Sequence, residues 1–131
     1  MKKILLVLFL LGAFFARAAD APALPRLIEL GADKCIPCKA MKPIIDELTK
    51  EYAGQLDVVF IDVWKDRAAG ERHGIQSIPT QIFLRADGKE AFRHEGFFAK
   101  KDILAKWKEL GVELKPKPAA PTPTKAKPAA H

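Results

Sequence analysis

The only two cysteines of this 131-residue chain, Cys35 and Cys38, are three positions apart. At this spacing on the first turn of a helix, two sulfurs lie on one face and can reach disulfide distance. The start of a helix favours a negative charge, and Lys34 and Lys39 flank the pair with positive charge. These effects favour thiolate over thiol, and thiolate is the attacking form. We therefore expect Cys35, nearer the helix end, to attack a disulfide and Cys38 to resolve the mixed disulfide.

Other uses of such a pair are less consistent with the sequence. A zinc site needs two further ligands, and the three histidines, His73, His94 and His131, stand at no standard spacing. Attachment of a c-type haem needs a histidine directly after the second cysteine, where Lys39 stands. An inert structural bridge remains an alternative, although so short a loop gains little from it. We expect a redox-active disulfide and no metal or other cofactor.

The first 18 residues have the pattern of a secretory signal peptide. Two lysines follow Met1, an apolar run occupies 4–15, and Ala16-Arg17-Ala18 gives a small-x-small ending. The run of about 12 residues is shorter than the roughly 20 that a membrane-spanning helix needs. We expect cleavage after Ala18 and no stable membrane insertion afterwards, with an uncleaved anchor as the alternative.

The other end of the chain, 115–131, contains five prolines and four lysines and no large apolar residue. We expect it to be a disordered tail. Of the net charge of +6, residues 1–18 carry +3 and 115–131 carry +4, which leaves −1 for 19–114. The basic character therefore belongs to the two ends, and nucleic-acid binding is not expected. Nothing in 111–114 indicates an oligomer interface, so we expect a monomer.

Hydrophobic periodicity predicts seven elements between these ends. Apolar runs predict strands at 27–30 and 58–61, the second of them typical of a strand covered on both faces. Helical spacing of apolar residues predicts an amphipathic helix over about 38–53, which Pro43 should kink. A short helix at 66–73, a hairpin of 81–84 and 90–93 around Asp87-Gly88, and a helix at 101–110 complete the set. This order predicts an α/β domain with a central mixed sheet.

Four motifs in order resemble the thioredoxin family. They are Cys35-Ile36-Pro37-Cys38-Lys39, Pro43 in the following helix, the stretch 74–80 around Pro79, and Gly96 after the hairpin. The resemblance covers about 26–114. It implies a thioredoxin-like three-layer fold at 27–114, with a four-stranded mixed sheet flanked by helices. The version would be minimal, because 19–26 is only a short extension and leaves no room for the family's N-terminal strand and helix.

The resemblance also implies roles for further residues. The bond before Pro79 would be cis, with its loop against the cysteine pair, and a client peptide would dock there as an added strand. The implied client-binding residues are Ile36, Pro37, Ser77, Ile78 and Gly96.

Glu29 stands where the family carries a buried acid. A carboxyl on an apolar strand should have a raised pKa and could accept the proton of Cys38; the alternative is that its side chain turns outward. The chain departs from the family at Phe60, Lys34 and Gly31, where the family has a lysine and two tryptophans. These departures bear on the proton path and the docking surface.

Pro37 between the cysteines and Ile78 before Pro79 resemble reducing members, whereas oxidising and isomerising members usually carry histidine between the cysteines. We expect a protein-disulfide reductase that acts outside the cytoplasm, most simply in the periplasm, on disulfide-containing protein clients. A membrane thiol-reducing electron carrier would recharge it. A disulfide oxidase or isomerase and a non-catalytic binding or chaperone module are the alternative functions, and a secreted or membrane-tethered protein is the alternative location.

Overall fold

Seven elements follow one another in residues 23–118, the part of the chain that the computed structural model describes. In chain order they are β1 (Arg26–Gly31), α1 (Ile36–Glu51), β2 (Asp57–Asp62), α2 (Arg67–Arg72), β3 (Thr80–Leu84), β4 (Glu90–Glu95) and α3 (Lys100–Glu109). The predicted order is confirmed, and every boundary lies within two residues of its prediction. The predicted signal peptide and residues 119–131 of the predicted tail lie outside the described residues.

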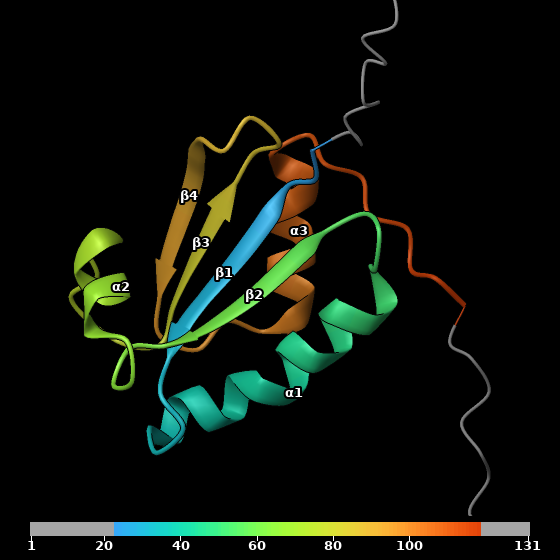
Figure 1. The fold of residues 1–131 in the computed structure, drawn as a ribbon. Helices are drawn as coiled ribbons and strands as arrows, with labels where there is room; N and C mark the ends of the chain where they lie inside the picture. Colours follow the sequence, from blue (N-terminus) through green and yellow to red (C-terminus); the bar gives the residue numbers. More distant parts are fainter. Residues whose placement is uncertain (1–22, 119–131) are drawn as a thin grey trace, which may run out of the picture.

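The four strands form one mixed sheet in the order β2-β1-β3-β4 (Figure 1). β1 pairs parallel with β2 and antiparallel with β3, and β4 completes a hairpin with β3. The predicted four-stranded mixed sheet is therefore confirmed. Since β1 has a partner on each side, Leu27 through Gly31 are all buried.

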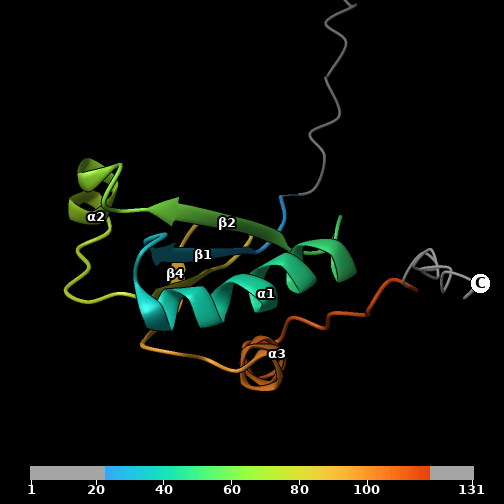
Figure 2. The same ribbon diagram turned by 90° about the horizontal axis from the view of Figure 1, so that it is seen from below.

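Helices α1 and α3 pack together on one face of the sheet (Figure 2). The core on that face joins β1, β3 and both helices through Leu27, Met41, Ile45, Leu48, Phe83, Ile103 and Trp107. Phe83 lies at its centre, with ring centroids 4.7 Å from Trp107 and 5.4 Å from Phe92. A smaller cluster on the opposite face contains Ile28, Leu30 and Ile82, with Val63 and Ile75 from beside α2 packed against it. The three-layer arrangement agrees with the predicted fold.

The environment of β2 differs from its prediction. The continuous apolar run 58–61 predicted a strand covered on both faces, but β2 is an edge strand whose residues are partly exposed. Phe60 is 47 % exposed. The prediction was wrong because an apolar run indicates a strand but does not show how completely other elements cover its two faces.

The first four residues of the predicted tail lie within the described part of the chain. The side chain of Gln55 donates to Lys115 O at 2.6 Å and accepts from Lys115 N at 2.9 Å. The backbone N–H of Lys117 donates to Glu51 O at 2.8 Å. These bonds attach the start of that segment to the end of α1. Among residues 23–118, no helix has the length and apolar character needed to cross a membrane.

Candidate active site at the start of helix α1

The two cysteines form a disulfide at the N-terminus of α1, with their Cα atoms 5.2 Å apart. Cys35 is the N-cap residue, and its Sγ accepts the backbone N–H of Cys38 at 3.4 Å. Its own N–H donates to Ala32 O at 3.1 Å, and its carbonyl accepts from Lys39 N at 3.0 Å. In the reduced protein, the same helix-start N–H and the helix dipole stabilise a thiolate at Cys35.

The two cysteines differ in exposure. Cys35 is partly exposed, whereas Cys38 is only 5 % exposed. Ile36, between them, is 81 % exposed, and the lysines on either side of the pair, Lys34 and Lys39, are also exposed. Cys35 is therefore the cysteine that another molecule can reach from solvent.

Asp62 holds the loop that leads into the cysteine pair. Its carboxylate accepts the backbone N–H of Asp33 at 3.2 Å, of Trp64 at 2.9 Å and of Lys65 at 3.2 Å. Desolvation acts to raise the pKa of Asp62, but these three donors and the Lys65 ammonium outweigh it and lower the pKa below its usual range. Lys65 also forms an ion pair with Asp33. The β1–α1 loop is thereby attached to the β2–α2 loop, which positions the approach to Cys35.

Sequence analysis missed Asp62. The available signal was a strand that ends in aspartate directly before a loop, where this side chain commonly accepts backbone N–H groups.

Gly31, the last residue of β1, allows close packing around Cys38. A Cβ atom at this position would lie 3.2 Å from Phe60 Cε2, 3.3 Å from Cys38 Cβ and 3.4 Å from Cys38 Sγ. Any side chain here would displace the phenyl ring or the cysteine. The absence of a side chain at 31 and the aromatic ring at 60 therefore belong to one packing arrangement.

Glu29 is buried near Cys38. It is 1 % exposed, so the alternative of an outward-turned side chain is wrong, and neither carboxyl oxygen has a hydrogen-bond partner in the structure. Glu29 and Cys38 line the same cavity of about 210 Å³. The other lining residues are Ala32, Asp33, Lys39, Met41, Lys42, Ile45, Asp46 and Phe60.

Burial raises the pKa of Glu29 to about 8, and the neighbouring Gln81 amide lowers it only in part. The amide nitrogen of Gln81 also donates to Gly96 O at 3.2 Å, and it makes no well-aligned hydrogen bond to the carboxyl. At pH 7 roughly one Glu29 carboxyl in ten is ionised. A group of this kind can both accept and return a proton near neutral pH.

The loop before β3 lies at the same end of the sheet as the cysteine pair, because β3 begins where β1 ends. The Ile78–Pro79 peptide bond is cis. The N–H of Gly96 donates to Pro79 O at 2.7 Å, and the Ser77 hydroxyl donates to Glu95 at 2.8 Å. Ser77 and Ile78 precede β3, and Gly96 follows β4. The structure thus brings these implied client-binding residues to the end of the sheet at which Cys35 lies.

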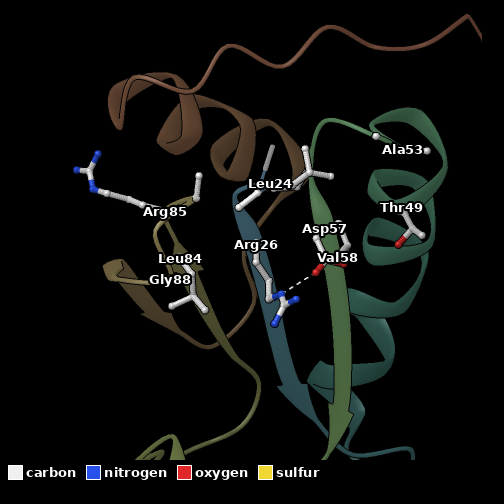
Figure 3. A pocket seen from close by; sticks show the side chains of 13 residues that line it. Leu24, Arg26, Thr49, Ala53, Asp57, Val58, Leu84, Arg85 and Gly88 are labelled. Carbon is white, nitrogen blue, oxygen red and sulfur yellow. Dashed lines mark hydrogen bonds and ion pairs between the residues drawn. The ribbon is translucent and has the colours of Figure 1, made fainter. Parts of the chain in front are cut away.

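A larger hollow of about 580 Å³ lies at the opposite end of β1 (Figure 3). Arg26 and Asp57 face each other across it and form an ion pair of 2.6 Å. No cysteine lines it, so size alone does not identify the redox site. Among residues 23–118, no group of three or more His, Cys, Asp or Glu side chains is arranged to hold a metal ion.

The raised pKa of Glu29 predicts how stability depends on pH. Folded wild type keeps a proton that the unfolded chain releases, so its stability should fall relative to Glu29→Gln as the pH rises from about 4.5 to about 8. The slope should approach about 1.4 kcal/mol per pH unit, and the total loss should be on the order of 5 kcal/mol. Urea unfolding of both oxidised proteins between pH 4 and 9 measures it. A constant difference across this range would show that Glu29 titrates normally in the folded protein.

Comparisons with known proteins agree with this site. A family model described as Thioredoxin matches residues 7–109. Thioredoxin C-2 of Corynebacterium nephridii is 32% identical over 92 residues, which cover 70% of this chain and 83% of that protein. The thioredoxin of Rickettsia conorii is 36% identical over 81 residues, covering 62% of this chain and 76% of its own. The thioredoxin of Borreliella burgdorferi is 37% identical over 65 residues, which cover 50% of this chain and 56% of that protein.

A solved structure supports the fold. The chain described as "Structure of a malarial protein" superposes with a TM-score of 0.62 at 22% identity, covering 66% of this chain and 96% of that one. At this identity the likeness concerns the fold alone. The family match, by contrast, includes the bonded cysteine pair at the start of α1. The chain therefore belongs to the thioredoxin family, and its bonded pair is the redox centre of a thiol–disulfide oxidoreductase.

Proposed function

We propose that this protein reduces disulfide bonds of other proteins outside the cytoplasm. The observation that carries the proposal is the placement of Cys35, a partly exposed residue whose sulfur accepts a backbone N–H at the start of α1, while its partner Cys38 is buried. This arrangement lets one cysteine attack a client and the other complete the exchange.

The reaction begins when the Cys35 thiolate attacks a client disulfide. A Cys35–client disulfide forms, the client S–S bond breaks, and one client thiolate leaves. The Cys38 thiol then gives its proton to ionised Glu29 and attacks the Cys35 sulfur. This step forms the Cys35–Cys38 disulfide and releases the second client thiolate, so that two electrons pass from the dithiol to the client. During recharging by an external dithiol, Glu29 returns the proton to the departing Cys38 sulfur.

The client approaches as an extended peptide beside Ile78 and Pro79. Two observations support this placement. The loop before β3 lies at the same end of the sheet as the cysteine pair. The apolar side chains of Ile36 and Phe97, which are 81 % and 51 % exposed, are available to a client at that end. Backbone groups of Ile78 give affinity with little dependence on client sequence.

Loss of the attacking sulfur should abolish turnover. In insulin reduction driven by a chemical reductant, we expect Cys35→Ser to give only the uncatalysed rate. The matched variant Cys38→Ser, reduced first and then mixed with insulin without free reductant, should instead accumulate a mixed disulfide between Cys35 and insulin, visible as a mass increase that added reductant removes. Turnover retained in Cys35→Ser would favour a non-catalytic binding module.

The direction of exchange follows from the equilibrium potential of the cysteine pair. Pro37 adds no charge that would stabilise the reduced form, so equilibration against glutathione should give a value near the roughly −270 mV of reducing members. A potential near roughly −120 mV would identify an oxidase instead.

The signal-peptide pattern of residues 1–18 supports a site of action outside the cytoplasm, most simply the periplasm. There, a membrane thiol-reducing carrier would supply the electrons. Expression of the full chain in a bacterium, followed by fractionation and N-terminal sequencing, tests this location. We expect a periplasmic protein that begins at Ala19. An intact Met1 in the soluble cytoplasmic fraction would contradict export, and an intact leader in the membrane fraction would indicate a tethered form.

A further inference from the structure

The side chain of Gln81 lies between the buried acid and the loop that receives the client. Gln81 and Glu29 are direct partners in the antiparallel pairing of β1 with β3, and they are 0% and 1% exposed. The same Gln81 amide group that lowers the pKa of the Glu29 carboxyl also donates from its nitrogen to Gly96 O at 3.2 Å. One buried amide therefore adjoins both groups. Sequence analysis missed this residue, although Gln81, like Glu29, is a polar side chain within an apolar strand.

The unpartnered atoms at this position complement one another. Both carboxyl oxygens of Glu29 and the Oε1 atom of Gln81 are buried without a hydrogen-bond partner in the structure. Leaving such atoms unpaired is costly. An ionised carboxylate can only accept, which suits the amide N–H of Gln81, whereas a protonated carboxyl also offers an O–H, which suits Oε1. Each protonation state of Glu29 thus favours a different atom of the same amide.

Gly96 connects this amide to the cis-proline loop. Its carbonyl accepts from Gln81, and its N–H donates to Pro79 O at 2.7 Å. Its φ of 93° is in the region that favours glycine. This backbone conformation directs the Gly96 carbonyl to Gln81 and the Gly96 N–H to Pro79. A change in the orientation of the Gln81 amide alters the bond to the Gly96 carbonyl.

We propose that Gln81 is a positioning residue that transmits the protonation of Glu29 to the client-docking loop at Gly96 and Pro79. When Cys38 gives its proton to Glu29 during resolution, the amide turns Oε1 toward the new O–H and loosens its bond to Gly96 O. The docking loop relaxes in the step in which the client thiolate leaves. This inference rests on the proposed function, because it assigns a moment in the same exchange reaction.

Other charged groups also face this region. Lys39, Lys42 and Asp46 of α1 and Asp33 of the preceding loop line the cavity that holds Glu29, while β2 contributes the uncharged Phe60. Lys42 pairs with Asp46 at 3.0 Å and Asp33 pairs with Lys65. On the side of Gly96, a ring nitrogen of His94 lies 3.2 Å from Phe97 O. All of these groups are unchanged in Glu29→Gln. This variant therefore measures how much their titration, without that of Glu29, shifts the Gly96 resonance.

The test follows the amide resonance of Gly96 by NMR between pH 6 and 10 in the oxidised protein, where neither cysteine titrates. In wild type we expect a shift with a midpoint near 8, the pKa of Glu29. Both Glu29→Gln and Gln81→Met should lose most of its amplitude. Methionine retains the length of glutamine but cannot hydrogen-bond to the carboxyl. The control Ile82→Val, a small change on the other face of the same strand, should keep the wild-type shift.

A second readout separates transmission from a structural effect. Insulin reduction by Gln81→Met should continue, but the KM for insulin should lose the pH dependence of wild type around this midpoint. A Gly96 resonance that still titrates near pH 8 in Glu29→Gln, or in folded Gln81→Met, would overturn the inference. Absence of turnover in wild type on the same samples would instead refute the proposed function.

Discussion

The bond from the Cys38 N–H to the Cys35 sulfur is the interaction on which the chemistry of this protein depends. It exists because Cys35 is the N-cap of α1, where the first backbone N–H groups have no partner within the helix. The Cys38 N–H that the Cys35 sulfur caps is therefore also the donor that stabilises a thiolate at Cys35. Helix formation and cysteine activation are one event, and Asp62, by fixing the loop before the helix, serves both.

The second constraint is a pair of polar side chains within an apolar sheet. Glu29 and Gln81 occupy positions on central strands where apolar side chains would stabilise the fold more. In exchange, the raised pKa of Glu29 gives the cavity that Cys38 and Phe60 also line a group that can exchange a proton near neutral pH. The same strand pairing that buries the acid places an amide between it and the docking loop.

Much of the fold could be predicted from local signals. The helix periodicity of α1 and α3, the Asp87-Gly88 turn and the short apolar strands each depend on neighbours in sequence, and the structure has all of these elements. The partial exposure of β2 was missed, because an apolar run does not show which elements pack on the two faces of a strand. Asp62 and Gln81 were also missed, since their contacts join residues far apart in the chain.

The sequence by itself determined the spacing of Cys35 and Cys38, their place at a helix start and the order of strands and helices, since these follow from the local geometry of the chain. Only the tertiary structure decided which sulfur is exposed, that Glu29 points inward to a cavity shared with Cys38, and that Gln81 connects it to Gly96. The physical reason is that burial, and with it the pKa of a carboxyl, is set by the elements that pack against a residue and not by the residues beside it in the chain.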